Sequence, residues 1–181
     1  MFWRSAGVDA GQIERHIPAL RRFAWALLRD GAAADDLVQD CLERALSRWH
    51  LHRADGDLRA WLFTILHNLF RNGRRSVARR GNAVPIEDDA GHGIADDAAG
   101  GAAEGHLIWQ DALAGLAALP EEQRSVLLLV GVEGFSYEEA ARLLGVPLGT
   151  VMSRLSRGRE RLHRLIEGEN APARPALRRV K

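Results

Sequence analysis

The segment from Phe135 to Leu162, FSYEEAARLLGVPLGTVMSRLSRGRERL, constrains the fold more than any other part of this chain. Ser136 and Glu139 match a capping box, in which the two residues satisfy free backbone amides at a helix start. Gly145 stands where a helix ends in a left-handed residue, and Pro147 suits the start of the next helix. Two helices joined by a turn of about three residues predict a helix-turn-helix.

The second of these helices has one apolar face and one small or basic face. Winding it at 100° per residue, as an α-helix requires, groups an apolar stripe: Val151, Leu155, Gly158, Leu162 and Leu165. The outward side chains are small or basic, so the helix can enter the major groove, where Arg can bind guanine and Ser or Thr can contact bases or phosphate. The candidate DNA-binding residues are Thr150, Ser153, Arg154, Ser156, Arg157 and Arg161. An ordinary amphipathic helix with a solvated arginine face would show the same pattern.

Three further helices are expected nearer the N-terminus. Apolar residues recur at helical spacing in residues 12–30, 34–49 and 58–76, and short loops between these segments would let them bury one shared core. Gly31 is expected to end the first of these helices. Asp35 and Asp36 are expected in the first turn of the second, where the helix dipole favours acids.

Residues 82–105 separate the two helical parts and differ from both. They contain six acids and no Lys or Arg, whereas residues 1–81 carry 14 Arg against nine acids and residues 106–181 carry 11 basic against nine acidic residues. The segment is rich in Gly, Ala and Asp and has no apolar period, which predicts a flexible linker. The sequence therefore predicts an all-α chain of two small domains, 1–81 and 106–168, the second a four-helix domain, with a disordered tail over 169–181.

Composition argues against several other classes. A single cysteine, Cys41, excludes an internal disulfide and fits a reducing compartment. The start of the chain has no signal-peptide pattern and no stretch approaches a membrane span, so we expect a soluble, cytoplasmic protein without membrane insertion. His50 and His52 lack the neighbouring ligands that a zinc site needs. No nucleophile–base pair or phosphate loop is evident, so we expect no enzyme activity, cofactor, metal or small-molecule substrate.

Three segments in order resemble bacterial sigma factors of the extracytoplasmic-function (ECF) group. They are DDLVQDCLERAL, DLRAWLFTILHNLFRNGRR and the long C-terminal run LPEEQRSVLLLVGVEGFSYEEAARLLGVPLGTVMSRLSRGRERL. The resemblance covers roughly residues 10–167. It implies a transcription initiation factor that works on core RNA polymerase, with the first domain at the −10 promoter element and the second at the −35 element.

The first of these segments resembles the helix with which sigma factors dock on a coiled coil of the polymerase's largest subunit. Carboxylates facing arginines across such an interface would supply orientation and specificity. Spacings of three and four residues place the candidates on one helix face. They are Asp36, Gln39, Asp40 and Glu43. A merely solvated acidic face is the alternative.

The second segment resembles the promoter-melting helix, which captures a flipped base of the non-template strand. Such capture needs a cationic track for the strand and a pocket for the base. Opposite the expected core stripe lie Arg59, His67, Asn68, Arg71 and Asn72, and the candidates that follow them are Arg74 and Arg75. Asn68 is the best candidate for reading a base edge. The loop Leu51–Asp57 would form the pocket, or is a plain turn.

The resemblance also implies partners: core RNA polymerase through its coiled coil and flap, promoter DNA, and an anti-sigma factor that the sequence does not identify. The acidic linker would be threaded through the polymerase, or merely keep the domains apart. Met152 stands where many relatives carry a basic residue, which leaves the −35 sequence open. The alternative function is an autonomous helix-turn-helix regulator whose N-terminal helices sense a signal or dimerise.

Overall fold

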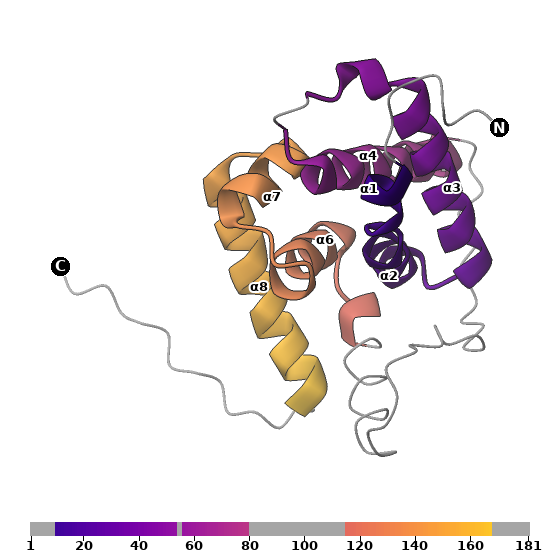
Figure 1. The fold of residues 1–181 in the computed structure, drawn as a ribbon. Coiled ribbons are helices and arrows are strands. Elements are labelled where there is room, and N and C mark those ends of the chain that lie inside the picture. Colours follow the sequence, from indigo (N-terminus) through magenta and orange to yellow (C-terminus); the bar gives the residue numbers. More distant parts are fainter. Residues whose placement is uncertain (1–9, 54–55, 80–114, 168–181) are drawn as a thin grey trace, which may run out of the picture.

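The structure is a computed structural model that describes residues 10–53, 56–79 and 115–167, and within this part every regular element is a helix (Figure 1). The elements are α1 (Ala10–Glu14), α2 (Ile17–Leu28), α3 (Gly31–Ser47), η1 (Trp49–Leu51), α4 (Leu58–Arg79), α6 (Glu121–Leu127), η2 (Leu128–Val132), α7 (Tyr137–Leu144) and α8 (Leu148–Glu167). The expected all-α fold with two helical domains is confirmed. The expected linker 82–105 and tail 169–181 lie outside the described residues.

The expected single helix over residues 12–30 is wrong, because it is two helices, α1 and α2. Pro18 stands in the first turn of α2, where its missing N–H costs nothing, and a helix running through it would lose a hydrogen bond. Gly31 does not end α2 either. Arg29 takes the left-handed conformation with φ 59° and donates its N–H to the Trp25 carbonyl. The Asp30 side chain accepts the Ala33 N–H at 3.1 Å, so Gly31 begins α3 and Asp35 and Asp36 fall beyond its first turn.

The core of the N-terminal domain forms where α2, α3 and α4 meet. The rings of Phe23 and Phe63 pack edge to face with centroids 5.3 Å apart, and both side chains are fully buried. Cys41, also fully buried, donates its thiol to the Leu62 carbonyl at 3.5 Å. This contact places the Cys41 side of α3 against α4, and the opposite side of α3 faces solvent.

The C-terminal domain contains the expected helix-turn-helix, formed by α7 and α8. Both hydrogen bonds of the capping box are present: Ser136 Oγ accepts the Glu139 N–H at 3.2 Å, and Glu139 Oε2 accepts the Ser136 N–H at 2.7 Å. Gly145 ends α7 with φ 66°, a conformation that costs glycine little. The first of the four helices expected in this domain falls on residues 106–119, most of which lie outside the described part.

The helix α6 passes into a π-helical turn, η2, before α7 begins. The Glu133 N–H reaches back five residues to the Leu128 carbonyl at 2.9 Å. A π-turn inserts an extra residue into a helix and thereby re-aims the side chains that follow it. Here it directs Glu133 and Phe135 toward the N-terminal domain.

The two domains lie against each other. In Figure 1, α7 lies beside the start of α4, and α6 lies beside α2. Arg124 of α6 donates to the Leu27 carbonyl at the end of α2 at 2.9 Å. The described residues include no helix that is both long and apolar enough to cross a membrane.

Candidate polymerase and nucleic-acid interfaces

The acidic candidates of α3 form one exposed face. Asp36, Gln39, Asp40 and Glu43 are all exposed, whereas Val38 and Cys41 of the same helix are buried. The Gln39 side-chain amide donates to Glu43 Oε1 at 3.1 Å, one helical turn along. Asp35, one residue outside this set, instead pairs with Arg21 of α2 at 3.0 Å. The geometry therefore leaves a compact acidic surface, available to a basic partner.

Some of the α8 candidates are exposed, and the others are half-buried with hydrogen bonds inside the protein. Ser156, Arg157 and Arg161 are exposed, while Thr150 and Ser153 are half-buried and joined by a hydrogen bond from Ser153 Oγ to the Thr150 carbonyl at 3.0 Å. The apolar stripe of α8 faces the core as expected at Val151, Leu155 and Gly158, which are buried. The expected core position of Leu165 is wrong, because its side chain is 47% exposed near the end of the helix.

Arg154, unlike the exposed Arg157, is largely buried and paired with an acid of the same domain. Its Nη2 donates to Glu122 Oε2 of α6 at 2.7 Å, and its side chain is only 22% exposed. This ion pair joins α6 to α8 inside the C-terminal domain. Met152, by contrast, is 52% exposed on the same helix and presents a thioether to solvent where a basic side chain could have stood.

The α4 candidates also divide. Asn68, Asn72, Arg74 and Arg75 are exposed and Arg71 is half-buried. Arg74 Nε lies 3.4 Å from Glu121 Oε2 of α6, an exposed ion pair. These residues form a polar, mainly cationic track along the second half of α4, as the sequence predicts.

The expected exposure of His67 is wrong, because the residue is 5% exposed. Winding the helix placed it opposite the core stripe, but the buried face of α4 also includes Phe63 and Phe70. Burial, together with the charges of Arg71 and Arg154, lowers the pKa of His67 to about 4, so the imidazole is neutral at pH 7. Arg154 belongs to α8, so this part of α4 faces the C-terminal domain.

Acidification is expected to destabilise the fold through His67. The pKa of His67 is lowered from 6.5 to about 4 in the folded chain, so below pH 6.5 the unfolded chain binds a proton at this residue more readily than the folded chain does. The free energy of unfolding is therefore unaffected by His67 above pH 6.5. It falls as the pH decreases from 6.5 toward 4, by about 2 kcal/mol at pH 5. Urea unfolding of the wild type and of His67→Gln at pH 7 and pH 5 measures it. The wild type should lose more stability than the variant, and equal losses would contradict the assignment.

Arg59 meets a residue that the sequence did not single out, Glu133. The Arg59 Nη2 donates to Glu133 Oε2 at 3.0 Å and also to the Glu133 backbone carbonyl. Arg22 of α2 donates to Glu133 Oε1 through Nε at 3.1 Å and Nη2 at 3.0 Å. We call this cluster of Glu133, Arg22 and Arg59 the Glu133 clamp. No periodicity marks Glu133, since it lies in a turn and its partners are 74 and 111 residues away.

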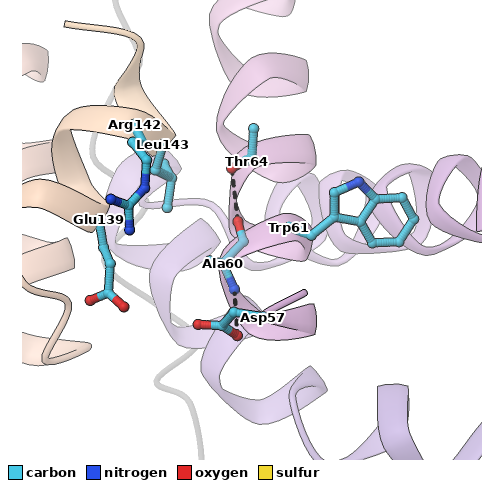
Figure 2. Close-up of a pocket in the computed structure, with 7 residues that line it drawn as sticks. All are labelled: Asp57, Ala60, Trp61, Thr64, Glu139, Arg142 and Leu143. Carbon is cyan, nitrogen blue, oxygen red and sulfur yellow. Dashed lines mark hydrogen bonds between the residues drawn. The ribbon is translucent and has the colours of Figure 1, made fainter. Parts of the chain in front are cut away.

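A cleft of about 210 Å³ opens between the start of α4 and α7. In Figure 2, Glu139 and Arg142 of α7 face Asp57, which precedes α4, and Ala60 and Thr64 of α4, whereas the Trp61 ring points away from α7. Asp57 caps α4, because its Oδ1 accepts the Ala60 N–H at 3.2 Å. The cleft is shallow and charged.

The expected base-capturing loop Leu51–Asp57 borders this region, although residues 54 and 55 lie outside the described part. Within the described part, the rings of Trp49, His52 and Trp61 form a three-way cluster: the His52 centroid lies 5.1 Å from that of Trp49 and 5.0 Å from that of Trp61, and the two indoles lie 6.0 Å apart. Gly56 donates its N–H to the Arg53 carbonyl at 2.8 Å. An aromatic cluster of this kind fixes the loop's anchor points beside α4.

Two family models match the chain, one for each domain. The sigma2 domain of PhyR matches residues 13–67, and sigma-70 region 4 matches residues 110–162. The N-terminal match covers α2, α3 and the first half of α4, and the C-terminal match covers the helix-turn-helix.

Similar proteins and structures extend over both domains. The ECF RNA polymerase sigma factor EcfG of Rhodopseudomonas palustris is 40% identical over 155 residues, which are 86% of this chain and 83% of that protein. SigL of Mycobacterium tuberculosis is 38% identical and covers 78% of this chain and 79% of its own length. The sigma factor RpoE of Bartonella quintana, solved with the anti-sigma factor NepR, has a TM-score of 0.71 at 38% identity and covers 88% of this chain and 97% of that one. CnrH, solved with the cytosolic domain of CnrY, has a TM-score of 0.61 at 25% identity over 89% and 88% of the two chains. The chain therefore belongs to the ECF RNA polymerase sigma factor family.

Proposed function

We propose that this ECF sigma factor docks on core RNA polymerase through the acidic face of α3. The observation that carries the proposal is a continuous exposed acidic surface on a helix whose opposite side is buried. Asp36, Asp40 and Glu43 would face arginines of the largest-subunit coiled coil, and Gln39 would add a neutral hydrogen bond. Charge complementarity of this kind fixes register and raises the association rate. The polymerase flap would hold the C-terminal domain, and the complex would work in the cytoplasm.

The two basic surfaces would then meet separate promoter elements. The cationic track of α4 suits a single strand at the −10 element, where Asn68 can reach a base edge and Arg71, Asn72, Arg74 and Arg75 can follow the backbone. The exposed side of α8 suits the −35 major groove. We propose that the two domains span residues 1–81 and 106–168 and are joined by the acidic segment 82–105.

An anti-sigma factor is the third proposed partner. RpoE of Bartonella quintana was solved with the anti-sigma factor NepR and CnrH with the cytosolic domain of CnrY. Similarity to both over most of their chains supports the same kind of partner here. A protein that covers the face of α3 or the track of α4 would exclude polymerase or DNA by steric overlap.

Arg157→Ala is expected to reduce transcription from promoters that depend on a −35 element by about tenfold, since a good Arg–guanine contact contributes about 1–3 kcal/mol. Because Arg157 is exposed, its substitution should not disturb the fold. Arg154→Ala is less suitable, because it also removes the ion pair with Glu122. Arg159→Ala, an exposed arginine on another side of α8, is the matched control. Runoff transcription on promoters with an intact and a scrambled −35 element is the measurement. A loss of equal size on both templates would contradict the assignment.

The experiment that tests the function as a whole is transcription in vitro with core RNA polymerase and genomic DNA fragments, followed by mapping of the 5′ ends. The sigma factor should produce discrete start sites that core polymerase alone does not produce. A chain that shifts an operator by itself and creates no new start sites would instead be an autonomous regulator.

A further inference from the structure

Met152 is the exposed side chain in the part of α8 that would enter the major groove. In helix-turn-helix proteins, the first residues of the second helix contact base edges. Over residues 150–155, all of which the structure describes, Met152 alone is exposed, at 52%, whereas Val151 and Leu155 are buried. The base-reading part of α8 therefore presents a thioether, which has no hydrogen-bond donor.

Two polar side chains of the same segment are hydrogen-bonded inside the protein. Ser153 is half-buried and donates its hydroxyl to the Thr150 carbonyl at 3.0 Å, and Arg154 donates to Glu122 of α6 at 2.7 Å. The first exposed arginine of α8 is Arg157. Met152 is thus the side chain of this segment with the largest exposed fraction available to a base.

The exposed neighbours of Met152 allow a close approach to DNA. Neighbours on a helix surface lie three or four positions apart, and here they are Leu148, Gly149 and Ser156. A Cβ added at Gly149 would meet no atom within 4 Å, so the space beside Met152 on this side is open. Because Gly149 and Ser156 are small, the unbranched and flexible Met152 side chain protrudes and can adapt to the surface that it contacts.

Thymine is the base that presents an apolar group in the major groove. Guanine, cytosine and adenine display hydrogen-bond donors and acceptors there, whereas thymine also displays its C5 methyl group. A thioether placed against a donor or acceptor would instead deprive that group of its bond to water. The exposed Arg157 and Arg161 of the same helix favour an anionic partner over an apolar protein surface.

We propose that Met152 is a specificity-determining residue of this sigma factor, which selects a thymine in the −35 element by packing its thioether against the C5 methyl group. This assignment rests on the proposed binding of α8 in the −35 major groove, and it names the base that one position of the helix reads. A basic side chain at residue 152 would select guanine instead. Methionine at this position therefore changes which promoters the chain selects.

Replacing thymidine by deoxyuridine tests the contact, because it removes the C5 methyl group and keeps the base pair. Each thymidine of the −35 element, on either strand, is replaced in turn in a labelled promoter fragment chosen from the mapped start sites. Fluorescence anisotropy then gives the affinity of the holoenzyme, assembled from core RNA polymerase and the chain, for every fragment. The variant is Met152→Ala. Leu165→Ala is the matched control, since Leu165 is 47% exposed near the other end of α8.

At one position, deoxyuridine should weaken binding by the wild-type holoenzyme about fourfold, the loss expected for one buried methyl group. Met152→Ala should bind the unmodified promoter less tightly than the wild type does. It should also bind the promoter with deoxyuridine at that position as tightly as the unmodified one. Leu165→Ala should respond to deoxyuridine as the wild type does.

Two results would overturn the assignment. The first is the absence of any methyl effect that depends on Met152, which includes a −35 element without thymine. The second is an equal loss of affinity in Met152→Ala with and without the methyl group, which would assign Met152 to a contact with polymerase or another protein. Failure of the proposed function is distinguishable, because scrambling the whole −35 element would then leave the affinity of the wild-type holoenzyme unchanged.

Discussion

The double charge reversal Asp36→Arg/Asp40→Arg is expected to weaken binding to core RNA polymerase by about a hundredfold, which corresponds to about 2.7 kcal/mol. Both residues are exposed on α3 and are one turn apart. Reversal replaces attraction by repulsion against a basic partner, and like charges placed together across an interface cost several kcal/mol. Affinity for core enzyme by fluorescence anisotropy or pull-down measures the change.

The matched control is Glu14→Arg/Asp35→Arg, which changes the net charge by the same amount in the same domain. Both residues are exposed, and Asp35 turns toward Arg21 rather than toward the acidic face. This control should bind polymerase nearly as the wild type does, with a modest increase in salt sensitivity. If both double variants lost affinity equally, the acidic face would act only through overall charge and the docking assignment would fail.

Phe63→Ala is expected to cost about 3–5 kcal/mol of stability, the usual range for removing a fully buried aromatic side chain. Its ring is 0% exposed and packs edge to face on Phe23 within the N-terminal domain and on Phe135 from the C-terminal domain. For a chain of this size, the midpoint of thermal unfolding should fall by about 10 °C.

Thermal unfolding followed by circular dichroism measures this loss. Leu51→Ala is the control, because Leu51 is 61% exposed and a surface change of this kind usually lies within about 0.5 kcal/mol of the wild type. A fall of only one or two degrees in Phe63→Ala would mean that α4 is not the centre of the core.

Local signals carried most of what the sequence predicted correctly. The capping box at Ser136 and Glu139 and the left-handed Gly145 are set by residues that are neighbours in the chain, and the structure confirms both. The acidic face of α3 follows from helical spacing alone. The wrong prediction at residues 12–30 also has a local cause. Pro18 favours the first turn of a helix, so a new helix begins at Ile17 even though the apolar pattern continues through this segment.

Contacts between the domains were the part that the sequence could not reveal. Helical winding assigned His67 to an outward face because it left Phe63 and Phe70 out of the buried face of α4, and Phe63 packs on Phe135 of the C-terminal domain. Glu133 gave no signal, because a single acid in a turn is ordinary and its role depends on Arg22 and Arg59 far away in the chain. The π-turn that aims Glu133 is likewise invisible to an apolar pattern of ordinary helical period.

The central claim is that the chain reads a promoter only when it is bound to core polymerase. Fluorescence anisotropy of a labelled promoter, chosen from the mapped start sites, tests it most directly with the chain alone, core enzyme alone and the two together. We predict weak, sequence-independent binding for the chain alone and tight, salt-resistant binding to the intact promoter for the combination only. Sequence-specific binding by the chain alone, unchanged when core enzyme is added, would contradict the account.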